Sequence, residues 1–323
     1  MIKNSRSKGI LITGGAWFHE IPGGAYKAAT ELAEYLAQEG HRVFYLAASE
    51  QKNLQFPIHH NGVEVWRYPK PTAPSPSLGN LLSHFYSVYK LAQKIQQIYP
   101  IGYLNGHDPL QFLASQQALK KETIKSSFSV HSPLVQEQKA HWGLSLNPTT
   151  KDQLSLKQAL ALKLFAILES VVYRWADVIQ TDSEFTLSEI TRDYPDAIGS
   201  KAAVRHLWVD LDRFLPCQDK TVVRRNLGQP WLCNEIIFFS LRRLVPRMGL
   251  DELIKAVGLL RDSNKSCRLI IGGSGPERQN LQALVDNLSL HDKVFFLRRV
   301  PDEDLPACYQ AADCWSWLWH GVC

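Results

Sequence analysis

Residues 268–277 read Arg-Leu-Ile-Ile-Gly-Gly-Ser-Gly-Pro-Glu, a short apolar run that leads through glycines into a helical pattern. The apolar run predicts a buried strand, and Pro276 is typical of the first turn of a helix. A strand, a glycine loop and a helix N-terminus in this order can bind phosphate through backbone N–H groups. We therefore expect Gly273, Ser274 and Gly275 to contact an anionic ligand. The loop lacks the Gly-Lys-Ser/Thr ending of a P-loop, which argues against ATP hydrolysis.

The same alternation of apolar runs and helical patterns extends along the whole chain. It predicts parallel sheets with helices on both faces. The expected strands cover Gly9–Thr13, Arg42–Leu46, Val63–Tyr68, Gly102–Asn105, Ser127–His131, Ala176–Asp182, Glu235–Leu241, Arg268–Gly272 and Lys293–Phe296. The expected helices cover Gly24–Glu39, Leu78–Ile98, Leu110–Leu119, Leu156–Trp175, a segment capped by Ser183, Leu250–Leu260, Pro276–Leu288 and Asp302–Ala311.

The alternation is interrupted once, at the polar segment Leu215–Thr221, which we interpret as a linker. A chain of 323 residues also suits two domains at about 150 residues each. We therefore predict an α/β protein of two Rossmann-like, doubly wound parallel-sheet domains, residues 1–214 and 215–323, that face a cleft. Ligands of open α/β sheets bind at the carboxyl ends of the strands, so the candidate site residues are expected there.

Composition excludes several classes of protein. Apolar residues make up 45% of the chain, and a net charge of +5 without a long basic block gives no reason to expect nucleic acid as a partner. The six cysteines contain no Cys-x-x-Cys pair, which argues against a zinc or thioredoxin-like site and suits a cytoplasmic protein. The longest apolar stretch, Leu154–Ala176, carries charges such as Lys163 and Glu169, so it predicts a core helix and not a membrane span.

Two polar segments follow expected strands of the first half. His131 ends one strand, and the pair His107-Asp108 follows another. These side chains are candidates for contact with a substrate, and a neutral His131 could orient a hydroxyl group or stabilise charge near a reacting carbon. A hydrogen-bonded histidine at the strand end and an ordinary polar loop are the structural alternatives.

A second glycine-containing loop, Thr13–Gly24, follows the first strand. Gly23 and Gly24 open the next expected helix, where the backbone can approach a ligand closely and free N–H groups attract anions. A tight turn between strand and helix is the alternative interpretation. The loop does not have the G-x-G-x-x-G pattern, so it does not indicate nicotinamide binding.

Three arginines surround the loop after the first strand of the second half. Arg242, Arg243 and Arg247 flank Leu244–Pro246 at the expected carboxyl end of that strand. Guanidinium groups bind phosphate oxygens in pairs, so this arrangement predicts a diphosphate clamp. A solvated surface loop is the alternative.

Taken together, these segments resemble glycosyltransferase family 4, a group of retaining enzymes with the GT-B architecture. The similarity extends over almost the whole chain, and it depends on the order and spacing of several motifs. The matching segments are Gly23–Ala25 with Leu32-Ala33, Gly40–Val43, Val130–Ser132, Ala176–Ile179 with Ser183-Glu184, Val209–Phe214, Arg243–Gly249, Gly272–Glu277 and Leu305–Asp313.

The resemblance implies that the second domain holds a nucleotide-diphospho-sugar as co-substrate and that the first holds a glycan or glycolipid acceptor. Arg243 would contact the diphosphate, usually with the help of a lysine, and leaving-group stabilisation would be electrostatic, with no metal or further cofactor. His131 would lie beside the sugar, and the loop at Gly23-Gly24 would approach the donor phosphates or the acceptor. The family also implies polysaccharide or glycolipid synthesis in the cytoplasm, with association at the inner face of the membrane as an option.

The chain departs from the family pattern at three places. Met248 stands at the position of the usual lysine, so Arg247 must supply the second positive charge or it is lost. His206–Trp208 replaces a proline and glycine turn. The segment Cys314–Cys323 carries three tryptophans where the family has a glutamate-containing loop. We interpret this last difference as a truncation or frameshift, which would leave the second domain incomplete and impair transfer.

Two other functions remain alternatives. The first is a non-catalytic nucleotide-binding remnant or a non-functional fragment. The second is a sugar-phosphate epimerase of similar shape, which the motifs around Arg243 and His131 fit less well.

Overall fold

The structure, a computed structural model, describes residues 8–51, 54, 57–70, 78–119, 124–144, 154–231 and 233–315. Its contacts divide the chain into two compact units. Apart from residues 143–152, the chain up to Leu207 belongs to the first unit and the chain from Trp208 belongs to the second. The C-terminal segment 316–323, which contains two of the three tryptophans of the unusual ending, lies outside the described residues. Each unit has its own sheet and its own cores, which we describe in turn.

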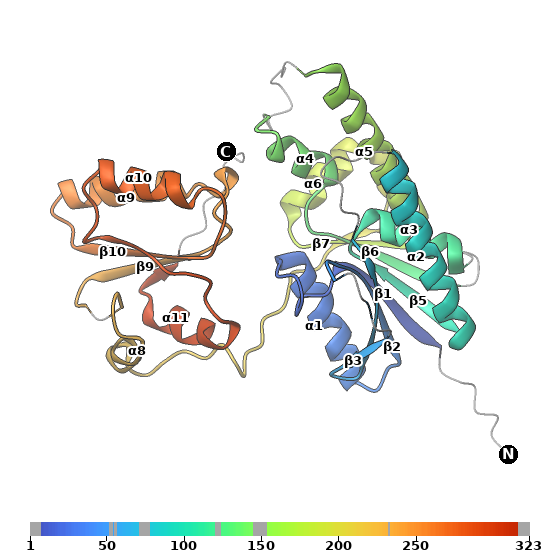
Figure 1. Ribbon diagram of the computed structural model, residues 1–323, viewed down its shortest axis with the longest axis horizontal. Helices are drawn as coiled ribbons and strands as arrows, with labels where there is room; N and C mark the ends of the chain where they lie inside the picture. The colour runs from blue at the N-terminus through green and yellow to red at the C-terminus, as the bar shows by residue number, and fades with distance from the viewer. Residues whose placement is uncertain are drawn as a thin grey trace. The chain divides into compact units, whose positions relative to one another are not determined.

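The first unit is built around a sheet of eight strands in the order β3-β4-β2-β1-β5-β6-β7-β8 (Figure 1). All neighbouring strands are parallel except β3 and β4, which form an antiparallel hairpin. Every residue of β2 is buried, as expected for a parallel strand that is covered on both faces. The strands are β1 Gly9–Ala16, β2 Val43–Ser49, β3 Ile58–His60, β4 Val63–Pro69, β5 Ile101–Gly106, β6 Lys125–Val130, β7 Val178–Thr181 and β8 Ala202–Val204.

Helices cover both faces of this sheet. Alternate residues of each strand point to opposite faces, so each strand contributes side chains to two cores. Along β2, Phe44 and Leu46 join one core, whereas Tyr45 packs into the other. The first core contains residues of α2, α3 and α5, and the second contains residues of α1. The helices of this unit are α1 Gly24–Gln38, α2 Leu78–Ile98, α3 Pro109–Leu119, α4 Leu134–His141, α5 Leu156–Trp175, α6 Glu184–Asp193 and α7 Pro195–Ile198.

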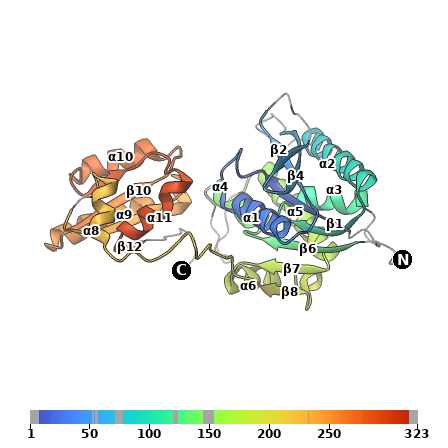
Figure 2. The same cartoon turned by 90° about the horizontal axis from the view of Figure 1, so that it is seen from below.

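The second unit has a smaller, four-stranded parallel sheet in the order β11-β10-β9-β12. Leu269 and Ile271 of β10 pack into one core, and Ile270 between them packs into the other. Helices α9 and α10 lie on one face of the sheet and α8 and α11 on the other, as Figures 1 and 2 show. The elements are α8 Lys220–Leu227, β9 Ile236–Leu241, α9 Leu250–Asp262, β10 Cys267–Gly272, α10 Arg278–Asn287, β11 Val294–Phe296, α11 Leu305–Ala311 and β12 Cys314–Trp315.

The predicted class, two doubly wound parallel-sheet units, is therefore confirmed, with differences at the ends of elements. The segment Leu215–Thr221 is not simply a linker, because α8 begins inside it at Lys220, where the Asp219 side chain accepts a 2.7 Å hydrogen bond from the amide of Thr221. Helix α10 begins at Arg278, after the predicted start at Pro276. The short elements β3, β8, α4 and α7 were not predicted, since segments of three to eight residues carry little periodicity. Each helix within the described residues is either too short or too polar to cross a membrane.

Candidate functional site

The carboxyl ends of β5 and β6 bring together two of the histidines that the sequence singled out. These strands are parallel neighbours, with Gly106 opposite Phe128, so the residues that follow them lie at the same edge of the sheet. His107 Nδ1 lies 2.8 Å from His131 Nε2, and the two rings stack at 5.1 Å between centroids. The structure therefore places His107 and His131 in one hydrogen-bonded pair.

The pair is held in one arrangement by a chain of hydrogen bonds. His107 Nε2 lies 2.6 Å from Asn105 Oδ1, and the amide nitrogen of Asn105 donates to Ser127 Oγ at 2.7 Å. The amide oxygen of Asn105 can only accept, so we assign the proton of neutral His107 to Nε2. His107 Nδ1 then accepts from Nε2–H of His131, which leaves Nδ1 of His131 unprotonated and able to accept a further hydrogen bond.

Burial keeps both imidazoles neutral. It lowers the pKa of His107 well below the usual value, and the neighbouring His131 lowers it further. Burial also lowers the pKa of His131, although the negative charge of Asp182 opposes this shift. A neutral, oriented histidine at a strand end is suited to accept or donate a hydrogen bond to a substrate hydroxyl group.

Asp108 caps a helix in this structure. Its Oδ1 accepts a 2.8 Å hydrogen bond from the amide of Gln111, in the first turn of α3, and Pro109 occupies the first helical position. Burial raises the pKa of Asp108, while backbone hydrogen bonds from Gln111 and Leu110 and the nearby His84 lower it. A contact between Asp108 and an acceptor stays a prediction.

Gln111 is a functional candidate that sequence reasoning missed. It is fully buried, its Oε1 accepts from the amide of Gly15, and its Nε2 donates to the carbonyl of Gly15, both at 2.9 Å. Its Nε2 also donates to Tyr68 Oη, which lies 2.5 Å from His84 Nε2. This network fixes the last residues of β1, where Gly15 has a φ of 81°. The sequence of α3 shows no amphipathic pattern that would separate buried from exposed polar residues, so it carried no signal for Gln111.

The loop after β1 ends at Gly23 and Gly24, and α1 begins at Gly24 as predicted. No side chain caps this helix, and its first turn contains no acidic residue. A side chain at Gly24 would meet no atom within 4 Å, which indicates open space around the first turn. An anion could therefore reach the N–H groups of α1, and the binding of one there stays a prediction.

Glu169 anchors the segment that follows His131. This α5 residue is only 2% exposed, and its carboxylate accepts hydrogen bonds from the amides of Leu134 and Val135 at the start of α4. The hydroxyl groups of Tyr173 and Tyr194 donate to the same carboxylate at 3.2 and 2.7 Å. Burial raises the pKa of Glu169, and these four hydrogen bonds oppose the shift. The carboxylate thus replaces the side-chain cap that α4 lacks.

In the second unit, the loops after β9 and β10 lie side by side. The strands are parallel neighbours with Leu241 opposite Gly272, so both loops leave the same edge of the sheet. The amide of Leu244 donates to the carbonyl of Ser274 at 3.0 Å, and its carbonyl accepts from the amide of Glu277 at the same distance. The arginine loop and the glycine loop are therefore joined through their backbones.

This contact requires glycine at two of the predicted positions. A Cβ atom at Gly273, which has a φ of 126°, would lie 1.9 Å from the carbonyl oxygen of Arg242. One at Gly275 would lie 2.2 Å from the carbonyl oxygen of Leu244. Ser274 stands between these glycines in the same loop. The glycines thus serve the close approach of two loops, whether or not they also contact a ligand.

Positive charge gathers along the arginine loop. Arg243 is exposed and Arg247 is half-buried. Burial lowers the pKa of Arg242, and the like charge of Arg247 lowers it further, so these two guanidinium groups repel one another. Met248, at the position of the usual lysine, is 8% exposed and packs into the core with Leu244. Because Met248 replaces the lysine, arginines alone supply the positive charge of this loop. An anion bound there would relieve the repulsion between them.

Comparison with known families assigns almost the whole chain. The model of Glycosyltransferase Family 4 matches residues 22–213, and the model of Glycosyl transferases group 1 matches residues 229–316. The first match alone covers more than half of the chain. Together the two matches span both units described above.

Curated relatives are similar to part of the chain. A GDP-mannose-dependent alpha-(1-6)-phosphatidylinositol monomannoside mannosyltransferase of Mycolicibacterium smegmatis is 37% identical over 144 residues, which are 44% of this chain and 36% of that protein. Mannosylfructose-phosphate synthase of Agrobacterium fabrum is 31% identical over 156 residues, 45% of this chain and 33% of that protein. The chain thus aligns with about a third of the length of these curated relatives.

Solved structures share the architecture. Sucrose-phosphate synthase from Thermosynechococcus elongatus is similar with a TM-score of 0.74 and 18% identity, over 95% of this chain and 74% of that one. A glycosyltransferase involved in lipopolysaccharide biosynthesis is similar with a TM-score of 0.66 and 13% identity, over 96% and 75%. At these identities the likeness concerns the fold, which is the GT-B fold.

Proposed function

The chain belongs to glycosyltransferase family 4, and from this premise we propose that it moves a sugar from a nucleotide-diphospho-sugar to a glycan or lipid acceptor, with retention of configuration at the transferred carbon. One observation carries the proposal. The arginine loop and the glycine loop of the second unit are joined through Leu244 and Ser274, which brings guanidinium groups and a turn of backbone amides to one sheet edge.

In the proposed reaction the second unit holds the diphosphate of the donor. Arg243, with Arg247, would bind its oxygens, and the backbone amides of the loop Gly273–Gly275 would donate to them. Negative charge grows on the diphosphate as the bond to the sugar breaks, so donors aimed at those oxygens lower the barrier. The charge repulsion between Arg242 and Arg247 supports an anionic ligand at this place.

The first unit would hold the acceptor and the reacting sugar. His131 makes a hydrogen bond with His107 through Nε2, so Nδ1 is the nitrogen that we expect to accept from a sugar hydroxyl group. The loop at Gly23-Gly24 would approach the donor phosphates or the acceptor through the open first turn of α1. His107 acts through His131 in this proposal, as a positioning residue.

GDP-mannose is the donor to test first, because the M. smegmatis relative is named for it, and mannose, glucose and galactose donors all remain compatible with the sequence. That relative is also named for a phosphatidylinositol acceptor, which supports a lipid acceptor. Along α5, Leu156, Leu160 and Leu164 are exposed near Lys157 and Lys163, a combination that suits an anionic lipid surface. We include peripheral association with the inner face of a membrane in the proposal.

Calorimetric titration of the full chain with GDP, UDP and ADP tests the donor site. We expect one nucleoside diphosphate to bind in the micromolar range and to raise the melting temperature. Incubation with GDP-mannose and a phosphatidylinositol acceptor then tests transfer. Tight nucleotide binding without transfer to any acceptor would favour the non-catalytic alternative. If none of the three nucleotides binds, the proposal is rejected.

Co-sedimentation with vesicles tests the membrane contact. We expect the chain to bind anionic vesicles more strongly than neutral ones, and equal binding curves for the two would contradict the contact.

A further inference from the structure

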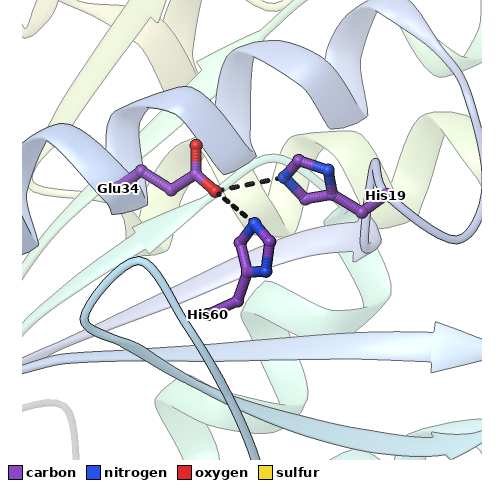
Figure 3. A group of neighbouring side chains, drawn as sticks. All are labelled: His19, Glu34 and His60. Atoms are coloured by element: carbon purple, nitrogen blue, oxygen red, sulfur yellow. Dashed lines mark hydrogen bonds and ion pairs between the residues drawn. The ribbon is translucent and has the colours of Figure 1, made fainter.

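Three side chains that bind metals in other proteins meet at one place in the first unit. His19 follows β1, Glu34 lies on α1, and His60 ends β3 (Figure 3). His19 Nε2 lies 3.1 Å and His60 Nε2 lies 3.4 Å from the same carboxylate oxygen, Oε1 of Glu34. The ligand atoms of all three side chains lie within 4.8 Å of one another.

The two distances between a histidine and the carboxylate suit a tetrahedral zinc ion. Nitrogen and oxygen ligands lie about 2.0–2.2 Å from Zn²⁺, so two of them in a tetrahedron are about 3.3–3.6 Å apart. The separations of 3.1 and 3.4 Å between Glu34 and the two histidines lie close to this range. The 3.4 Å between His60 Nε2 and Glu34 Oε1 exceeds the usual 2.7–3.2 Å of an N–H···O hydrogen bond, so a direct hydrogen bond explains this contact poorly.

The surroundings of the cluster orient its side chains. Trp17 is 1% exposed, and its ring lies 5.3 Å from that of His19 and 5.9 Å from that of His60. The side-chain nitrogen of Asn61 donates a 3.1 Å hydrogen bond to Glu34 Oε1. Partners of this kind fix the direction of metal ligands.

The cluster is also open to a metal ion from solvent. The side chains of His19 and His60 are 42% and 41% exposed, while that of Glu34 is 15% exposed. Two imidazoles and one carboxylate are a ligand set that zinc accepts, with water in the fourth position. We propose that His19, Glu34 and His60 form a Zn²⁺-binding site.

Zinc at this place would join three segments of the first unit. The loop after β1, which leads to Gly23-Gly24, would be tied to α1 through Glu34 and to the β3–β4 hairpin through His60. Because an ion that binds only the folded chain stabilises it by mass action, zinc would raise the melting temperature. The inference does not rest on the proposed function, since it concerns no group of the transfer reaction.

Competition between the full, reduced chain and a chromogenic zinc chelator tests the site. We expect the natural chain to bind one equivalent of zinc. His60→Ala should lose this zinc or bind it about 100-fold more weakly, because removing a metal ligand costs at least as much affinity as removing a residue that hydrogen-bonds to a ligand. His59→Ala is the matched control, since the neighbouring residue of β3 is exposed and belongs to the opposite face of the strand. Both variants keep all cysteines, so zinc bound by cysteines contributes equally to each and cancels in the comparison.

Glu34→Gln gives an independent variant that keeps the shape of the side chain, and circular dichroism checks that each variant is folded. Co²⁺ gives a second readout, because Co²⁺ held tetrahedrally by imidazole and carboxylate ligands absorbs visible light, and both variants should lose this band. Equal zinc stoichiometry and affinity in the natural chain, His60→Ala and Glu34→Gln would overturn the proposal. So would a natural chain that takes up no zinc at 100-fold excess over the protein, in which case the cluster is an ion-paired contact only.

Discussion

At the scale of single residues, the histidine pair after β5 and β6 couples stability to pH. Burial lowers the pKa of both His107 and His131 in the folded chain, whereas the unfolded chain has the ordinary value of about 6.5. Below that pH the unfolded chain binds protons that the buried pair resists. The stabilising contribution is therefore fully present above about pH 6.5 and is lost as pH falls through the lowered values.

We predict that the free energy of unfolding of the natural chain falls between pH 7.5 and pH 5, and that His107→Gln makes this fall shallower. The slope should approach about 1.4 kcal/mol per pH unit for each proton that only the unfolded state binds. Urea unfolding at a series of pH values measures it. His41→Gln, which changes an exposed histidine, should keep the natural slope. Equal slopes for His107→Gln and His41→Gln would contradict the assigned pair.

Arg243 is the residue on which the donor site depends most directly. We predict that Arg243→Ala weakens the affinity for a nucleoside diphosphate by about 10- to 100-fold, because a hydrogen bond to a charged group is worth about 1.5–3 kcal/mol. Titration calorimetry at fixed salt measures the change. Arg192→Ala is the control, since Arg192 is exposed on α6 and pairs with the adjacent Asp193. A dissociation constant that both variants leave unchanged would remove Arg243 from the site.

At the scale of elements, α4 depends on a carboxylate from α5. Helix α4 has Pro133 at its N-cap position and no side-chain cap of its own, so the buried Glu169 satisfies its first amides. The segment between β6 and α4 contains His131, and the position of that histidine is thereby linked to the packing of α5. A change at Glu169 should therefore affect both stability and the site.

We predict that Glu169→Gln destabilises the first unit by about 1–3 kcal/mol, because one of the two carboxylate oxygens becomes an amide that cannot accept from the buried donors. Denaturant unfolding measures the loss, and Glu39→Gln, at an exposed position after α1, should change it by less than about 0.5 kcal/mol. If Glu169→Gln proves as stable as Glu39→Gln, the Glu169 carboxylate does not stabilise the first turn of α4.

At the scale of the whole molecule, each unit has its own sheet and its own pair of cores. A domain with its own core can unfold as a separate cooperative unit. The groups proposed to bind the diphosphate lie mainly in the second unit, so a bound nucleotide should stabilise the two units unequally.

We predict that calorimetry of the full chain resolves two transitions and that a nucleoside diphosphate moves mainly one of them. At 100 times its dissociation constant the ligand should add about 2.7 kcal/mol to the unit that binds it. Arg243→Ala, scanned at the same nucleotide concentration, should reduce this stabilisation to about 0.4–1.4 kcal/mol, in line with its 10- to 100-fold weaker binding, and leave the other transition in place. A single transition whose calorimetric and van't Hoff enthalpies agree would contradict independent unfolding.

Much of the fold could be predicted because its signals are local. The apolar run before Gly272 and the helical pattern of α2 specify a strand and a helix without reference to the rest of the chain. The short elements and the start of α10 depend on capping and packing, and their predicted bounds were missing or displaced.

The site could be predicted only in part. The arginine and glycine loops were found because each follows a strand in the sequence, and parallel pairing of β9 and β10 brings them together. Gln111 and Glu169 were missed, since a buried polar residue inside a helical pattern looks like an exposed one until its partner is known. The half-buried His84 was missed because its partner, Tyr68, is distant in sequence. The metal contact proposed at His60 was missed because His19, Glu34 and His60 lie on three separate segments that no sequence spacing connects.

By itself, the sequence determined the class of fold, the glycine and arginine loops and the family, because periodicity, turn residues and motif spacing are properties of neighbouring residues along the chain. Only the tertiary structure decided which nitrogen of His131 is engaged, which carboxylate caps α4, and that His19, Glu34 and His60 converge. Those contacts join segments that are distant in sequence. They depend on strand order, register and packing, which no local pattern encodes.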